Sequence, residues 1–138
     1  MSLSANGKLK RISEQVLIAG YKVSSIRVRE ACLENNFTVN RAVLMLIRQE
    51  QLKISLENLC IKNGYNPNKK LIICSCNKYN FKSRKVEQYI MKLLKARKSV
   101  HEQCIKSNIN ISDTELDESI IGAFGNESRA FNKIQLDH

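Results

Sequence analysis

Residues 38–60, TVNRAVLMLIRQEQLKISLENLC, carry the clearest structural pattern of the chain. Apolar residues recur there every three or four positions, which is the period of a helix with one buried face. The strongest part of that face consists of Ala42, Val43, Leu46 and Ile47. The pattern continues more weakly to Cys60, and Gly64 supplies a stop signal. We therefore expect a long helix that begins at Val39.

Weaker helical patterns lie on both sides of this stretch. Upstream, Ile12, Val16 and Leu17 predict a short helix that closes at Gly20, and residues 26–35 predict a second one. Downstream, we expect a helix over residues 84–105 with Ser83 as its N-cap. Ser112 and Glu115 form a capping box for a further helix, which Gly125 ends. The fold class that follows is mostly α.

The segment plan has five parts, and no internal repeat is evident. Phe131, Ile134 and Leu136 give the last part apolar groups for packing on a partner or for self-association. The parts are a flexible N-terminus (1–11), a three-helix module with an extended third helix (12–63), a basic loop and helix (64–107), an acidic capped helix (108–125) and a mobile tail (126–138).

Composition bounds the class of protein. The chain has 138 residues, of which 43% are hydrophobic and 26% charged, and this is typical of a globular domain. No stretch approaches the roughly 18 apolar residues of a membrane span, and no secretory signal is evident. Five cysteines without a regular framework favour reduced thiols. We therefore expect an intracellular protein of the cytoplasm or the nucleus.

The net charge of +10 is unevenly distributed. Residues 61–106 hold twelve Lys and Arg against two acids, whereas residues 107–138 hold two against six. A dense positive segment predicts a polyanionic partner, and phosphate backbones are the commonest polyanions. We therefore expect a regulatory or accessory factor that binds RNA or DNA.

The candidate nucleic-acid-binding residues combine cations with aromatic rings near an expected helix N-terminus, where backbone N–H groups receive anions. They are Lys78, Tyr79, Phe81, Lys82, Arg84, Lys85, Lys92, Lys95 and Lys98. Three alternatives stay open for this segment. It can be a solvated helix face, it can be masked by the acidic helix at residues 113–118, or it can meet an acidic protein or an anionic membrane surface.

Cysteine and histidine residues suggest one possible cofactor. Cys74 and Cys76, together with His101 and Cys104, form a C-x-C and H-x-x-C pattern that could supply four zinc ligands. The alternative is that these cysteines are buried as small apolar residues, as we expect for Cys32. The sequence calls for no other cofactor.

The sequence offers no catalytic constellation. Of its two histidines, His138 is the last residue, and His101 has no evident orienting acid or oxyanion hole. No glycine-rich phosphate loop is present. We therefore expect a binding protein and not an enzyme.

Residues 12–48 resemble the ubiquitin-associated (UBA) and CUE families of three-helix domains. The resemblance rests on Ala19-Gly20-Tyr21, on residues 28–36 (VREACLENN) and on residues 37–47 (FTVNRAVLMLI). It implies a three-helix bundle and a competing function, a protein adaptor that binds ubiquitin or another protein. The positions implied as contacts are Ala19, Gly20, Tyr21, Leu46 and Ile47. The alternative is that Tyr21, Leu46 and Ile47 are packing residues of a helical domain.

Overall fold

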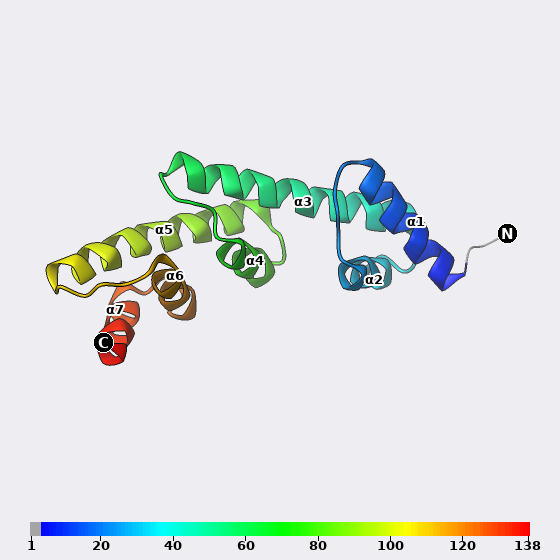
Figure 1. Cartoon of the computed structure of the whole chain (residues 1–138). Coiled ribbons are helices and arrows are strands. Elements are labelled where there is room, and N and C mark those ends of the chain that lie inside the picture. Colours follow the sequence, from blue (N-terminus) through cyan, green and yellow to red (C-terminus); the bar gives the residue numbers. More distant parts are fainter. Residues whose placement is uncertain (1–3) are drawn as a thin grey trace. The chain divides into compact units, whose positions relative to one another are not determined.

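The computed structural model describes residues 4–138, and all of its regular secondary structure is helical (Figure 1). The expected mostly α fold is confirmed, and no strand occurs among the described residues. No helix in this part of the chain combines the length and apolar character that a membrane span needs. The helices are α1 (Ala5–Ile18), α2 (Ser25–Glu34), α3 (Val39–Lys62), α4 (Lys69–Lys78), α5 (Ser83–Lys106), α6 (Asp113–Gly122) and α7 (Glu127–Asp137).

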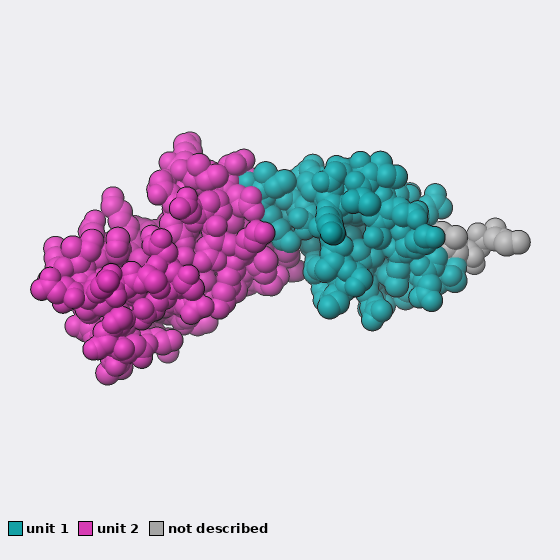
Figure 2. Space-filling view, in the orientation of Figure 1, with its two compact units in different colours: residues 1–54 teal, residues 55–138 magenta. Residues whose placement is uncertain are grey.

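The chain divides into two compact units, which Figure 2 shows in different colours. Unit 1 ends at Ile54 and unit 2 begins at Ser55. In unit 1, α1 packs on α2, and the core also takes residues from the first part of α3. Seven buried residues form that core: Ile12, Val16, Val28, Ala31, Cys32, Ala42 and Leu46.

Unit 2 is organised around α5. This helix contacts α4, α6 and α7, and α6 contacts both α4 and α7 (Figure 1). Eight residues of α5 are buried, spread over its whole length from Val86 to Cys104. Because one face of this 24-residue helix is buried along most of its length, α5 packs against α4 and also against α6 and α7.

The helices repeat with a period of 44 residues. The two 24-residue helices begin 44 positions apart, at Val39 and Ser83, and end 44 positions apart, at Lys62 and Lys106. The 10-residue helices α2, α4 and α6 begin at Ser25, Lys69 and Asp113, again at intervals of 44. We number the repeats 1 to 3 and take them as residues 11–54, 55–98 and 99–138, which contain α2, α4 and α6 in turn.

The helix boundaries show the same period in their hydrogen bonds. Each 10-residue helix has an N-cap side chain that accepts the backbone N–H three positions later. The caps are Ser24, Asn68 and Ser112, at 3.3, 3.2 and 3.2 Å. The turn after each of these helices contains two consecutive residues with positive φ. The second of them donates its N–H to the carbonyl oxygen five positions back. The pairs are Asn36-Phe37, Asn80-Phe81 and Phe124-Gly125, at 2.8, 2.8 and 3.1 Å.

The buried positions repeat as well, which shows that the three repeats have the same packing. Ala31, Ser75 and Ser119 form one position that is buried in every repeat, and six further positions are buried in every repeat with apolar side chains. In the order of repeats 1, 2 and 3 they are Ile12, Leu56, Val100; Val16, Cys60, Cys104; Val28, Ile72, Leu116; Cys32, Cys76, Ile120; Ala42, Val86, Ala130; and Leu46, Ile90, Ile134. The expectation that the chain has no internal repeat was therefore wrong.

Several boundaries also differ from expectation. Residues 126–138, expected as a mobile tail, contain α7 with Ala130 and Ile134 buried. Residues 5–11, expected as flexible, belong to α1. Residues 71–74 form a short apolar run whose periodicity does not distinguish a strand from a helix, and they lie in α4. Ser83 is the first residue of α5, and the N-cap position is Lys82.

Two leucines of α3 provide a test of the core. Leu46 is 1% exposed and Leu44 is 48% exposed, although both lie in the same helix. We expect Leu46→Ala to lower the free energy of unfolding by about 2–5 kcal/mol, because it removes buried methyl groups and leaves a cavity. Leu44→Ala should change it by no more than about 0.5 kcal/mol. Urea denaturation followed by circular dichroism measures both, and equal losses would contradict the assignment of Leu46 to the core.

Candidate nucleic-acid interface

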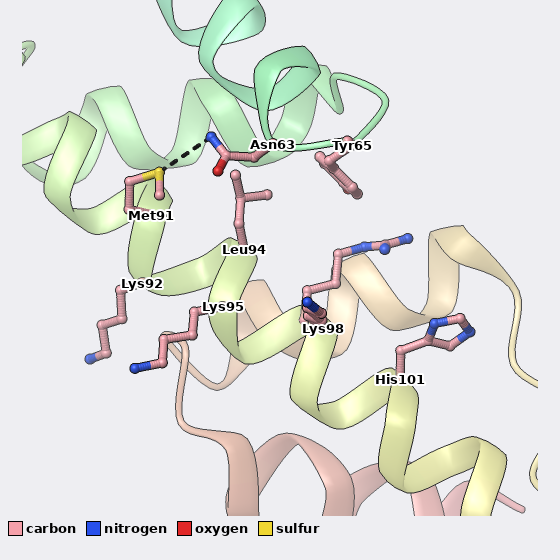
Figure 3. Close-up of a pocket in the computed structure, with 10 residues that line it drawn as sticks. Asn63, Tyr65, Met91, Lys92, Leu94, Lys95, Lys98 and His101 are labelled. Atoms are coloured by element: carbon pink, nitrogen blue, oxygen red, sulfur yellow. Dashed lines mark hydrogen bonds between the residues drawn. The ribbon is translucent and has the colours of Figure 1, made fainter.

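A groove of about 780 Å³ runs beside α5 in unit 2 (Figure 3). One wall is the turn that follows α3, and the other is the middle of α5. The lining residues include no acid. They are Asn63, Gly64, Tyr65, Met91, Lys92, Leu94, Lys95, Arg97, Lys98 and His101.

Backbone geometry fixes the turn that forms the first wall. Gly64 has φ of 75°, a left-handed conformation that glycine adopts without steric cost. The Tyr65 N–H donates to the Cys60 carbonyl oxygen at 3.0 Å, which closes the helix end. The Asn63 side chain donates to the Leu59 carbonyl oxygen at 2.8 Å and lies 3.7 Å from the Met91 sulfur. The turn is therefore held against both helices.

The groove has an apolar floor and a basic rim. Met91 and Leu94 lie between the α5 backbone and the Asn63–Tyr65 turn, whereas Lys92 and Lys95 extend away from that turn (Figure 3). Lys92, Lys95 and Lys98 follow one another at intervals of three residues, so they span about 9 Å of helix axis. All three are exposed.

Lys92 and Lys95 also border a second, smaller hollow of about 410 Å³ at the start of α7. Gly125 lines this hollow with φ of 76°, and a Cβ there would lie 3.4 Å from the Lys92 side chain. Glycine at position 125 therefore leaves room for the side chains of Leu93 and Lys92. Glu127 belongs to the same hollow and accepts a hydrogen bond from Ser99 at 3.0 Å.

Among the residues that line the groove, Arg97 is the cation whose ion pairs with acidic side chains are seen. Its Nε lies 2.6 Å from an Asp117 oxygen, and a terminal nitrogen lies 2.9 Å from Asp113. Its guanidinium also stacks 4.3 Å from the Tyr65 ring centroid. Asn68, the cap of α4, donates to the other Asp117 oxygen at 2.8 Å. Arg97 thus ties the groove wall to α6, and its charge is balanced by two carboxylates.

The acidic helix masks only part of the basic segment. Besides the two contacts to Arg97, Glu118 lies 3.7 Å from the Lys70 ammonium. Glu115 was expected to reach back to its own cap, but its carboxylate lies 2.8 Å from His138. The masking alternative therefore holds for Arg97 and Lys70.

The sequence candidates occupy three different places. Lys92, Lys95 and Lys98 lie together on the groove. Lys82, Arg84 and Lys85 are exposed around the start of α5 and are not among the groove's lining residues. Lys78 ends α4 with its ammonium 4.5 Å from the Phe124 ring centroid and 5.5 Å from that of Tyr89.

The two aromatic candidates have packing roles. Tyr79 makes an edge contact with Tyr89 at 5.4 Å between ring centroids, and Tyr89 is buried in α5. Phe81 occupies the left-handed turn after α4 with φ of 58°. Neither residue lines the groove. The aromatic and apolar groups that do, Tyr65, Met91 and Leu94, were not predicted.

The protein-contact candidates in unit 1 differ in exposure. Ala19 and Gly20 are exposed, and Ile47 is partly exposed. Tyr21 is partly buried and packs against the core of unit 1. Leu46 is buried in that core, so its assignment as a contact residue was wrong. The UBA and CUE resemblance itself stays a prediction.

The predicted zinc ligands do not come together. Within residues 4–138, no three side chains of His, Cys, Asp or Glu gather closely enough to hold a metal ion. Cys74 and Cys76 are two positions apart on α4, so they face different sides of the helix, and only Cys74 is exposed. Burial, with a smaller effect of Glu115, raises the pKa of the Cys104 thiol and disfavours the thiolate that zinc binds. Cys76 and Cys104 are core residues of repeats 2 and 3.

Asp113 and Asp117 provide a matched pair for testing the Arg97 contacts. The Asp117 side chain is 6% exposed and the Asp113 side chain is 86% exposed. We expect Asp117→Asn to lower the free energy of unfolding of unit 2 by about 3 kcal/mol, because it leaves a largely buried guanidinium without its main counter-charge. Asp113→Asn should cost about 0–1 kcal/mol. Urea denaturation measures both, and equal small losses would show that the buried pair does not stabilise the unit.

The Tyr65 hydroxyl provides a test at alkaline pH. It is buried, and no hydrogen-bond partner within 3.5 Å is found for it among the described residues. Burial, followed by the effect of Asp117, raises the pKa of Tyr65 well above its ordinary value near 10. The folded chain therefore retains a proton that the unfolded chain releases, so stability falls as the pH rises above about 10.

Tyr65→Phe should make that fall shallower, because the ring and its contact with Arg97 remain and the titrating group is gone. Urea denaturation between neutral and alkaline pH measures the effect, and Tyr79→Phe is the control for loss of a hydroxyl. An unchanged pH dependence would contradict the assignment.

Comparison with known proteins adds no relative. No protein-family model, curated protein or solved structure matches the chain. The three repeats can be compared with one another. They have the same buried positions but carry different surface residues at equivalent positions.

Proposed function

We propose that the protein binds nucleic acid through repeat 2, with Lys92, Lys95 and Lys98 contacting phosphates along the groove beside α5. The observation that carries this proposal is the row of three exposed lysines on a groove whose lining residues include no acid. Such a row attracts a polyanion, and lysine is a common ligand of phosphate groups.

The internal repeat supports the proposal because it separates what the fold needs from what the surface carries. Forty-four positions earlier, repeat 1 has Arg48, Gln51 and Ile54 in place of the three lysines. Repeat 1 keeps the same helices and buried positions with those residues. Packing therefore does not require lysine at positions 92, 95 and 98. Binding of an anion gives a reason for the lysines found there.

The other cations of repeat 2 extend the positive field. Lys82, Arg84 and Lys85 are exposed around the N-terminal end of α5. Arg97 is paired with Asp113 and Asp117, so it contributes little free charge to the groove. A field of this kind speeds association and makes affinity depend on salt. We propose a non-enzymatic regulatory or accessory role.

The test is fluorescence anisotropy of labelled oligonucleotides over a salt series. We expect affinity to fall linearly on a double-logarithmic plot, as counterion release requires. Changing Lys92, Lys95 and Lys98 together to Glu should weaken binding and reduce the salt slope by about 2 for a single strand, at about 0.7 per phosphate contact.

The control variant changes Lys10, Lys22 and Lys133 to Glu. These lysines are also exposed, and the net charge changes by the same amount, but none of them lines the groove. The control should retain most of the affinity. Equal losses in both variants would mean that total charge and not the groove determines binding, and a salt-independent affinity would contradict phosphate contacts.

A further inference from the structure

We infer that the groove binds single-stranded nucleic acid in preference to a duplex, an inference that rests on the proposed function. It depends on the groove's floor and not on its charge. Lysines alone attract any phosphate backbone, so they do not distinguish one strand from two. The residues beneath them do.

The floor is apolar, and its Met91 side is open to solvent whereas Leu94 is buried. Met91 is 41% exposed, and it lies beside Leu94 on the side of α5 that faces the Asn63–Tyr65 turn (Figure 3). A duplex presents phosphates and sugars at its surface and keeps the faces of its bases stacked inside. A single strand can turn an unstacked base toward the protein, where apolar and aromatic groups cover its face.

The shape of the groove fits the same ligand. Pockets of about 300–1,000 Å³ accept groups of drug size, and this groove has a volume of about 780 Å³. One base with its sugar can enter while the adjoining phosphates remain at Lys92 and Lys95 on the rim. A duplex is read by an element that projects into its grooves, and here the surface beside α5 is concave.

Met91 is the group on which the preference depends. Its thioether is polarizable and makes favourable contacts with aromatic faces. Tyr65 contributes less, because Arg97 already stacks on its ring at 4.3 Å from the centroid. The repeat 1 position that matches Met91 is Ile47, so the fold accepts different apolar residues there.

The experiment compares Met91→Ser with Ile73→Ser in the full chain. Ile73 is an ideal control because it is 43% exposed, belongs to α4 and is not among the groove's lining residues. Each protein is titrated into a labelled single-stranded RNA, the same sequence as single-stranded DNA, and the matching DNA duplex, near physiological salt. Circular dichroism melting checks that both variants fold like the unmodified chain.

We expect the unmodified chain to bind the single strands more tightly than the duplex. Met91→Ser should weaken single-strand binding by about two- to tenfold, the range of a thioether contact with an aromatic face, and leave duplex binding unchanged. Ile73→Ser should leave both unchanged.

Other results would overturn the inference in distinguishable ways. Equal affinity for strand and duplex, or an equal loss for both with Met91→Ser, would contradict the single-strand preference while the proposed function stands. No binding of any oligonucleotide would overturn both. A poly-glutamate peptide is also included as a competitor. If it displaces the single strand at equal charge concentration, the groove would be assigned to an acidic protein, which would overturn the inference.

Discussion

The structure depends on burying one face of each short helix. Helices α2, α4 and α6 have ten residues each, which is too short for a stable isolated helix in water. Each shares its core with the helix that follows it, which supplies two buried aliphatic side chains. In repeat 2 these are Val86 and Ile90 from α5, and in repeat 3 they are Ala130 and Ile134 from the 11-residue α7. Left-handed turns follow the short helices at the same interval, and the buried positions recur every 44 residues with them. The other features of the chain are built on this constraint.

Repetition of the core leaves the surfaces free to differ. Repeat 2 carries lysines where repeat 1 carries Arg48, Gln51 and Ile54. Repeat 3 carries the acidic first turn of α6, whose Asp113 and Glu115 lie where the helix dipole favours negative charge. One packing scheme thus supports a basic surface and an acidic helix within one unit.

Arg97 connects these two surfaces. It is paired with Asp117 in a largely buried setting and stacks on Tyr65, so the wall of the groove is positioned from α6. The cost of desolvating the guanidinium is offset by two carboxylates and an aromatic face. Asp113, Asp117 and Glu118 lie against Arg97 and Lys70, and no ion pair to Lys92, Lys95 or Lys98 is found among the described residues.

The sequence by itself determined the helical class, the long helix at residues 39–62, the Ser112 cap and the concentration of charge, because these depend on local periodicity, capping and composition. The dipeptide Asn-Phe also recurs after 44 residues, at Asn36-Phe37 and Asn80-Phe81. A match of two residues is too short to establish a repeat without the helix boundaries. Only the tertiary structure decided that Leu46 belongs to the core and not to a contact surface, two assignments that the sequence left open. It alone also decided that the predicted zinc ligands lie apart, and that Tyr65 and Met91 share a groove with three lysines. The physical reason is that burial and proximity between residues distant in sequence arise from packing, which local pattern does not specify.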